Sequence, residues 1–288
     1  MQIDYKMLAM QQPIVSVIIP FLNGSHWLIE AIESVISQTY REWELILVDD
    51  GSKEEHSIIG REYAFKHPEK IIYADHPGHI NMGVTISRNL GIGVSTGKYI
   101  AFLDSDDCWS PQKLQRQLEL FSLHPDAAMI CEASRFWYSW ENFSLEDVIV
   151  QVGSVPDKLY DPPELIYDLY PLGEGAPPCP TGIMIKREAF DRSGGFEESF
   201  TGVNQLYEDQ AFLFKIYLQE KVYVSGTANN LYRKRRGSLT ESANDQRHYY
   251  KVREFFFKWV EKYLYKHNIK NSKIENLIGE ARSAMKKF

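Results

Sequence analysis

Residues 99–110 read YIAFLDSDDCWS, an apolar run typical of a strand that stops on three acids, Asp104, Asp106 and Asp107. Carboxylates crowded at a strand end repel one another, so a cation among them would stabilise the cluster. Mg²⁺ and Mn²⁺ prefer oxygen ligands, and Mg²⁺ is usually held by one or two carboxylates together with substrate phosphates. The stretch therefore favours a divalent metal and a phosphate-bearing ligand. A solvated acidic turn is the plainer alternative.

The composition is that of an ordinary globular protein. Of the 288 residues, 44% are hydrophobic and 25% are charged. The net charge of -7 argues against general nucleic-acid binding, which needs a basic face. Three cysteines without C-x-x-C spacing, no apolar run of about 20 residues and no signal-peptide pattern predict a cytoplasmic protein.

The first 125 residues alternate between strand and helix patterns, which predicts a parallel sheet covered by helices. Strands are expected within 13–20, 43–48, 71–73 and 99–103, and helices over 25–38, 84–95 and from Ser110-Pro111 onward. In such sheets ligands bind beyond the carboxyl ends of the strands. Asp49-Asp50 and Asp104-Ser105-Asp106 both stand at such ends, so we expect them to converge on one crevice.

The second half is less regular. Helices are expected around 163–170, 187–193 and 208–220, strands over 222–225 and 231–233, and a helical tail from about residue 245. Residues 244–288 hold 11 Lys or Arg against five Asp or Glu, and residues 255–264 read FFFKWVEKYL. Packing on the preceding domain or a dimer contact explains this aromatic helix, and a membrane-surface helix is the alternative. A homo-oligomer is left open.

Five stretches carry a family resemblance: VSVIIPFLN (15–23), AIESVISQTYREWELILVDDGS (31–52), SRNLGIGVSTGKYIAFLDSDDCWSPQKL (87–114), TGIMIKREAFDRSGGFEESF (181–200) and YEDQAFLFK (207–215). Over about residues 13–240 the chain resembles the family-2 inverting glycosyltransferases. The resemblance implies a GT-A fold, an α/β architecture with a Rossmann-like, mostly parallel mixed sheet flanked by helices.

The same resemblance implies a division of the chain. Residues 1–12 would be an N-terminal extension and 13–240 the catalytic domain, with a nucleotide-binding half (13–125) and an acceptor-binding half (126–240). Residues 241–288 would form a helical C-terminal appendage.

The resemblance also implies roles for individual residues. Asp106, with Asp104, would hold the metal that bridges the donor diphosphate, and Asp209 of the Glu208-Asp209 pair would be the catalytic base, with Glu208 the next candidate. The donor nucleotide would be bound by Pro20, Asp49, Asp50, Arg88, Asp104 and Ser105. The acceptor side would be shaped by Thr181, Gly182 and Gly195.

One departure from the family pattern concerns the late segment Y-R-x-H-x-x-S, whose His can ligate the metal or touch the diphosphate. Here Arg235 stands at the His position. Arginine has no free acceptor and cannot ligate a metal, but it can clamp phosphate oxygens through two N–H groups. We therefore expect Arg235 or Arg236 to compensate the charge of the leaving diphosphate.

The function implied is sugar transfer with inversion from a nucleoside-diphosphate sugar, with uridine expected, to a hydroxyl acceptor, aided by Mn²⁺ or Mg²⁺. The acceptor would be a saccharide, a lipid-linked or another hydroxyl compound in polysaccharide or cell-surface glycan synthesis. A peripheral contact with the inner membrane surface through the basic tail would suit a lipid-linked acceptor. The main alternative is a non-catalytic nucleotide-sugar-binding protein with the same fold.

Overall fold

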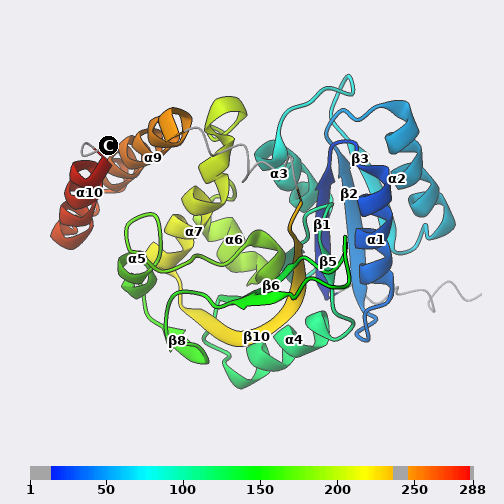
Figure 1. Ribbon diagram of the computed structural model, residues 1–288, viewed down its shortest axis with the longest axis horizontal. Helices are drawn as coiled ribbons and strands as arrows, with labels where there is room; N and C mark the ends of the chain where they lie inside the picture. The colour runs from blue at the N-terminus through cyan, green and yellow to red at the C-terminus, as the bar shows by residue number, and fades with distance from the viewer. Residues whose placement is uncertain (1–13, 236–245, 286–288) are drawn as a thin grey trace, which may run out of the picture.

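A single mixed sheet organises the molecule (Figure 1). The structure is a computed structural model and describes residues 14–235 and 246–285. Within them the strand order is β3-β2-β1-β4-β9-β6-β10-β5, with β7 beside β6 and β8 beside β10. The strands are β1 (Val15–Phe21), β2 (Trp43–Asp49), β3 (Ile71–Asp75), β4 (Tyr99–Phe102), β5 (Cys108–Trp109), β6 (Met129–Trp137), β7 (Val148–Val150), β8 (Lys158–Tyr160), β9 (Ile183–Lys186) and β10 (Val222–Arg233).

Helices cover both faces of this sheet. They are α1 (Ser25–Ile36), α2 (Glu54–Lys66), α3 (Val84–Val94), α4 (Lys113–Leu123), α5 (Glu164–Asp168), α6 (Arg187–Ser193), α7 (Glu208–Gln219), α9 (Gln246–Lys266) and α10 (Ser272–Met285), with short 3-10 turns η1 (Pro180–Gly182) and η2 (Gly202–Tyr207). Apolar side chains of α1 and α4 pack on one face, those of α3, α6 and α7 pack on the other, and α9 packs against α7 and η2. The predicted α/β fold class is therefore confirmed.

The first half follows the expected pattern closely. Strands β3, β2, β1 and β4 are parallel neighbours, and every residue of β1 and β2 is buried, as befits parallel strands covered on both faces. The helix α2 was not predicted. Its sequence, EEHSIIGREYAFK, buries only Ser57 and Gly60, so it carries no continuous apolar stripe from which a helix could be recognised.

The second half joins the first through an antiparallel strand. β9 pairs antiparallel with both β4 and β6, and β6 then pairs parallel with β10. The predicted strands 222–225 and 231–233 form one strand, β10, which is irregular between Ser225 and Asn230. One sheet thus continues across the expected boundary between the two halves of the catalytic domain.

The helix expected from Ser110-Pro111 starts later, at Lys113. The backbone N–H of Ser110 donates to the Asn229 carbonyl (2.8 Å), beside the pairing of β5 with β10. Ser110 is thereby kept in the sheet, and its carbonyl instead accepts the Lys113 N–H (3.1 Å). Tertiary pairing here overrides a strong local start signal.

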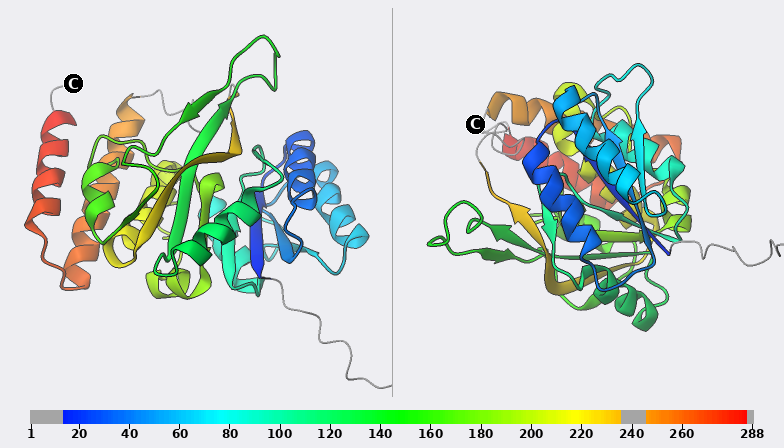
Figure 2. Two further views of the ribbon diagram at one scale, coloured as in Figure 1. Left: turned by 90° about the horizontal axis from the view of Figure 1, so that it is seen from below. Right: turned by 90° about the vertical axis from the view of Figure 1, so that its right-hand side faces the viewer.

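The C-terminal helices pack on the rest of the domain, as the two views in Figure 2 show. Val252, Phe256, Phe257 and Val260 of α9 are at most 1% exposed and belong to the same apolar cluster as α7. The packing interpretation of the tail is confirmed for these side chains, and they are not available to a membrane surface. Among the described helices, none combines the length and apolar character needed to cross a membrane.

Candidate active site

The acid segment at residues 104–107 leaves the end of β4 in a tight turn, in which the Asp107 N–H donates to the Asp104 carbonyl (3.0 Å). Because β2, β1 and β4 are parallel neighbours, this segment lies at the same edge of the sheet as the ends of β1 and β2. Two of its three carboxylates are bonded to arginine side chains, and the third is bonded to neutral donors.

Asp104 is held by a buried arginine. Arg88 of α3, only 2% exposed, donates from one terminal nitrogen to Asp104 (2.7 Å) and from the other to Glu208 at the start of α7 (2.5 Å). One guanidinium therefore joins two acids that lie more than 100 residues apart. Neither Arg88 Nε nor Glu208 Oε2 has a partner among the described residues, although both atoms are buried.

Asp106 is held by the arginine that replaces the family histidine. Arg235 donates to Asp106 Oδ2 from Nε (2.9 Å) and from a terminal nitrogen (2.7 Å). Its guanidinium lies over the Trp27 ring, with Cζ 4.4 Å from the ring centroid. Burial and the nearby charge of Asp104 raise the pKa of Asp106, and Arg235 opposes that shift. Arg236 lies outside the described residues.

Asp107 has neutral partners. It accepts the Thr181 hydroxyl (2.7 Å) and the Arg233 backbone N–H (2.8 Å). Burial, followed by the charges of Asp106 and Asp104, raises the pKa of Asp107 well above its ordinary value. Asp107 therefore links the acid segment to β10 and η1, and it was not among the predicted site residues.

This bonding pattern corrects one expectation about the cluster. From the sequence alone, a cation among the crowded carboxylates would stabilise them, which favours a metal. Arg88 and Arg235 supply two cations to Asp104 and Asp106 from within the chain. Acid crowding by itself is thus no argument for a metal here.

Glu208 and Asp209 open the helix α7, where the helix dipole favours negative charge. Burial raises the pKa of Glu208 to about 7, against the opposing effect of Arg88. Burial likewise raises the pKa of Asp209 to about 6. Asp209 Oδ1 accepts the Gln210 N–H (2.7 Å). A carboxylate with a pKa near 6 suits a general base that works near neutral pH.

Asp49 and Asp50 lie at the same sheet edge but are bonded to their own surroundings. Asp49 is fully buried and accepts the Ser52 N–H (2.8 Å) and the Tyr73 hydroxyl (2.8 Å). Burial alone would raise the pKa of Asp49, but these hydrogen bonds leave it below its ordinary value. Asp50 accepts the N–H groups of Met82 (2.7 Å) and Gly83 (3.0 Å).

The two other residues predicted to bind the donor, Pro20 and Ser105, lie at this edge of the sheet too. Pro20 is buried within β1 next to Val48 of β2, and Ser105 is partly exposed in the turn of the acid segment. The structure thus brings together Asp104, Arg88, Glu208 and Asp209, and it places Asp106 with Arg235. The roles of Pro20, Ser105, Asp49 and Asp50 in nucleotide binding stay predictions.

The three residues expected on the acceptor side are buried. Thr181 is fully buried, and its carbonyl accepts the Trp109 indole N–H (2.9 Å). The Gly182 carbonyl accepts the Gln117 amide (3.0 Å). Gly195 adopts a positive φ of 71° and accepts Lys215 Nζ (2.5 Å). Thr181, Gly182 and Gly195 therefore support the site from within, and their acceptor role stays a prediction.

Sequence reasoning did not assign Trp27, Glu30 or Arg233 to the site. Arg233 donates from Nε to the Asp106 carbonyl (2.7 Å) and pairs with Glu30 through a terminal nitrogen. Its guanidinium lies between the rings of Trp137 (4.4 Å) and Trp140 (5.0 Å). These contacts form because the end of β10 lies next to both the acid segment and α1. No local sequence pattern indicates that these distant elements are neighbours.

A divalent metal would find oxygen ligands here. Within residues 14–235 and 246–285, no group of three or more His, Cys, Asp or Glu side chains is arranged to hold a metal ion. Asp104 and Asp106 lie close enough for the charge of one to raise the pKa of the other. Two carboxylates completed by phosphate oxygens fit the donor set of Mg²⁺ or Mn²⁺. The chemistry of the residues therefore fits the predicted metal.

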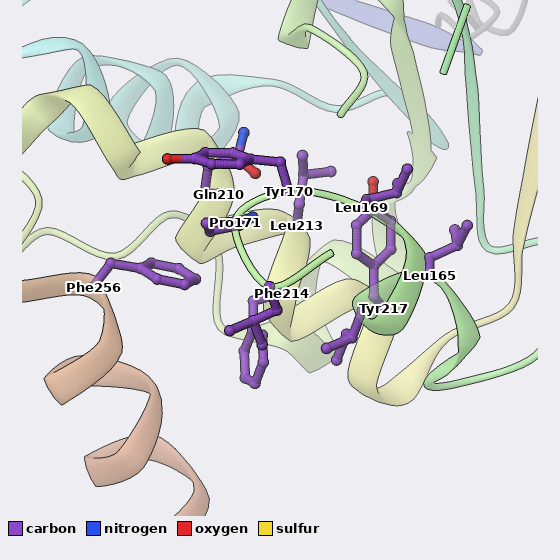
Figure 3. A pocket seen from close by; sticks show the side chains of 11 residues that line it. Leu165, Leu169, Tyr170, Pro171, Gln210, Leu213, Phe214, Tyr217 and Phe256 are labelled. Carbon is purple, nitrogen blue, oxygen red and sulfur yellow. The ribbon is translucent and has the colours of Figure 1, made fainter. Parts of the chain in front are cut away.

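A small apolar cavity lies between α5, α7 and α9 (Figure 3). Its volume is about 10 Å³, enough for about one water molecule, and its lining includes Leu165, Leu213, Tyr217 and Phe256. The buried Tyr217 hydroxyl has no partner among the described residues. The cavity is too small for a nucleotide and lacks the acid segment, so it is not the site.

The comparisons with known proteins show the family of the chain. The family model described as "Glycosyl transferase family 2" matches residues 16–194. The chain is 30% identical over 229 residues to "Uncharacterized glycosyltransferase RP339" of Rickettsia prowazekii (strain Madrid E), covering 75% of this chain and 66% of that protein. It is 35% identical over 160 residues to "Putative teichuronic acid biosynthesis glycosyltransferase TuaG" of Bacillus subtilis (strain 168), covering 54% and 56%.

The chain therefore spans between about half and two thirds of the lengths of these two relatives. Among solved structures, S. aureus TarS 1–349 in complex with UDP-GlcNAc matches with a TM-score of 0.63 and 20% identity, over 84% of this chain and 65% of that chain. At this level of identity the likeness shows the fold, and it confirms the predicted GT-A architecture.

Proposed function

Because this chain belongs to glycosyl transferase family 2, we propose that it transfers a sugar from a nucleoside-diphosphate donor, a UDP-sugar, to a hydroxyl acceptor with inversion of configuration. One observation carries the proposal. Arg88 joins Asp104, at the donor end of the site, to Glu208, the neighbour of the proposed base. The buried Arg88 side chain thus connects an acid proposed to act on the donor with the acid next to the proposed base.

The leaving diphosphate gains negative charge as the sugar departs. Arg235 is partly exposed beside Asp106, and its planar guanidinium can donate two parallel hydrogen bonds to phosphate oxygens. When bound, a divalent metal held by Asp104 and Asp106 would add further neutralisation of that charge. Fixed positive groups of this kind stabilise the transition state more than the ground state.

The acceptor hydroxyl is a poor nucleophile until a base removes its proton. Asp209 has a pKa of about 6, so it is ionised near neutral pH yet basic enough to accept a proton as the bond to the sugar forms. A base on the face opposite the leaving diphosphate gives direct displacement, which inverts the anomeric centre. Glu208 is engaged by Arg88 and is the second candidate.

The names of the relatives support an acceptor class. TuaG is named for teichuronic acid biosynthesis, and the TarS structure contains UDP-GlcNAc. These names support a UDP-sugar donor and an acceptor hydroxyl in a polysaccharide or cell-surface glycan. For the tail, the buried aromatic face of α9 supports a role in domain packing over membrane contact.

A non-catalytic sugar-nucleotide-binding protein is the second candidate. One observation favours it: Asp104 and Asp106 are both engaged by arginines, and the family histidine is absent. Binding of a nucleotide-sugar without transfer or hydrolysis would support this candidate.

The experiment is a turnover assay of the full chain with UDP-, dTDP- and GDP-sugars, Mn²⁺ and a panel of glycan acceptors. We expect nucleoside diphosphate release that depends on the acceptor, and a product whose anomeric configuration is opposite to that of the donor by NMR. Asp209→Asn should lower kcat about 10²- to 10⁴-fold while donor affinity changes little. Asp191→Asn, an exposed substitution on α6, is the matched control. An active Asp209→Asn protein would move the base elsewhere.

A further inference from the structure

The ion pair between Arg235 and Asp106 lies at the position that the family resemblance gives to the metal. Two nitrogens of Arg235 converge on the same oxygen, Asp106 Oδ2, at 2.9 and 2.7 Å. The Asp106 side chain is 28% exposed and that of Arg235 is 22% exposed. The pair is therefore within reach of solvent and of an incoming ligand.

The other arginine of the site is fixed by its surroundings. Arg88 is 2% exposed and bonds two acids at once, Asp104 and Glu208. If Arg88 left Asp104, a guanidinium that is only 2% exposed would lose one of its two partners, which is costly. Arg235 has one carboxylate partner among the described residues and its side chain is 22% exposed, against 2% for Arg88, so its departure from Asp106 costs less.

A divalent cation and a guanidinium cannot both occupy Asp106 Oδ2 at these distances, because two cations so close would repel each other. A guanidinium also matches a phosphate as well as it matches a carboxylate. The Trp27 ring, 4.4 Å from Arg235 Cζ, provides a surface on which the guanidinium can remain when it leaves Asp106. The side chain thus has a second anionic partner available once a nucleotide arrives.

We propose that Arg235 and the divalent metal are alternative partners of Asp106. Arg235 neutralises Asp106 in the nucleotide-free protein and transfers to the donor diphosphate when the metal and nucleotide bind together. Arg235 then keeps the metal site closed to the free ion, and it contacts the donor diphosphate once the metal–nucleotide complex binds. The proposal rests on the proposed function, since it assumes a nucleoside-diphosphate ligand.

The exchange predicts that replacing Arg235 changes the affinities for Mn²⁺ and for UDP in opposite directions. Removing the guanidinium should free Asp106 for Mn²⁺ alone and should also remove a phosphate contact. We expect Arg235→Gln to bind Mn²⁺ without nucleotide about 3- to 10-fold more tightly than the unaltered protein. We expect the same variant to bind UDP at saturating Mn²⁺ about 10-fold more weakly.

Mn²⁺ binding is measured on the full chain from the EPR signal of the free ion, and UDP binding by calorimetry. Arg192→Gln is the control, because Arg192 pairs with Glu220 through two nitrogens on the surface, away from the acid segment. Both affinities should stay unchanged in it. Arg235→Lys, which keeps the charge but loses the two-pronged donor, should lie between Gln and Arg in both measurements and serves if the Gln variant does not fold.

The outcomes separate this proposal from the proposed function. An unchanged or lower Mn²⁺ affinity in Arg235→Gln would overturn the exchange, even if the unaltered protein transfers sugar. A higher Mn²⁺ affinity together with weaker UDP binding would support the exchange, even if no acceptor is ever glycosylated. A higher Mn²⁺ affinity with unchanged UDP binding would overturn the transfer of Arg235 to the diphosphate.

Discussion

Asp49 and Asp50 at the end of β2 and Asp104 and Asp106 beyond the end of β4 lie at one edge of the sheet, yet their carboxylates have different kinds of partner. The first two accept N–H groups of nearby backbone and a tyrosine hydroxyl. The second two accept arginine side chains from α3 and from the end of β10. Both pairs look like acidic strand ends in the sequence.

The difference separates two uses of an acidic strand end. Neutral backbone donors leave a carboxylate charged and fix the course of the loop, so such an acid stabilises the local structure. A guanidinium brought from elsewhere neutralises the carboxylate and can be replaced by another cation. Each prediction below asks whether the two pairs of acids behave as differently as their partners indicate.

The largest expected difference concerns Asp106. We expect Asp106→Ala to weaken Mn²⁺-dependent binding of UDP by at least about 100-fold, because the proposed metal ligand is lost together with the partner of Arg235. Its free energy of unfolding should change by less than about 1 kcal/mol, since the lost ion pair is partly exposed. Calorimetry with UDP and Mn²⁺ and a thermal melt measure the two quantities. Normal UDP binding by Asp106→Ala would end the assignment of this acid to the donor site.

The protonation states of the acids give the next test. Asp209 has a pKa of about 6 because it is buried, whereas the pKa of Asp49 lies below its ordinary value. A base must be ionised to accept a proton, so kcat should fall about tenfold per pH unit below about pH 6 and level off above it. Because Asp209 and Glu208 are neighbouring acids, the observed midpoint belongs to the pair.

The measurement is kcat against pH at saturating donor, acceptor and Mn²⁺. If kcat fell only below about pH 3.8, the ordinary pKa of aspartate, the base would not be desolvated. Asp191→Asn should leave the profile where it is, because Asp191 is exposed on α6.

The sequence predicted the strands β1, β2 and β4 and the helices α1, α3, α6 and α7, because each carries a clear apolar pattern between turn residues. It did not predict α2, whose apolar residues are few, or β6, in which Glu132, Ser134 and Arg135 interrupt the apolar residues, or β9, a short apolar run without alternation. Such runs look the same whether they form a strand or a buried helix segment.

The sequence identified the acids and arginines of the site, but not which acid is bonded to which partner. Asp104, Asp106, Glu208 and Arg235 were all singled out from motif positions. That Arg88 bridges Asp104 and Glu208, and that Asp107 binds Thr181, depends on how distant segments pack. Side-chain partners separated by 16 to 120 residues leave no periodic signal in the sequence.

A smaller effect is expected for Asp50. Replacing it by alanine leaves the N–H groups of Met82 and Gly83 without their acceptor in a largely buried position. An unsatisfied buried donor costs about 1–3 kcal/mol, so Asp50→Ala should be destabilised by about 2 kcal/mol, or about 4–8 °C in Tm. Urea unfolding measures the change, with Asp191→Ala as the control. If Asp50→Ala melted like the unaltered protein, the two strand ends would no longer be distinguished by their structural role.

The smallest predicted effect asks whether the remote partners of the site extend to the C-terminal tail. The Tyr170 hydroxyl bonds the hydroxyls of both Tyr207 and Tyr249, so α9 reaches the residue that directly precedes Glu208. Loss of one hydrogen bond of this kind costs about 1 kcal/mol, which predicts a fall of about 2–4 °C in Tm for Tyr249→Phe. Tyr265→Phe is the matched control on the same helix, because Tyr265 is 89% exposed. Equal melting temperatures for the two variants would mean that α9 holds the start of α7 through apolar packing alone. A lower Tm for Tyr249→Phe would instead make the tail a polar support of the catalytic acids, as Arg88 and Arg235 are for the acid segment.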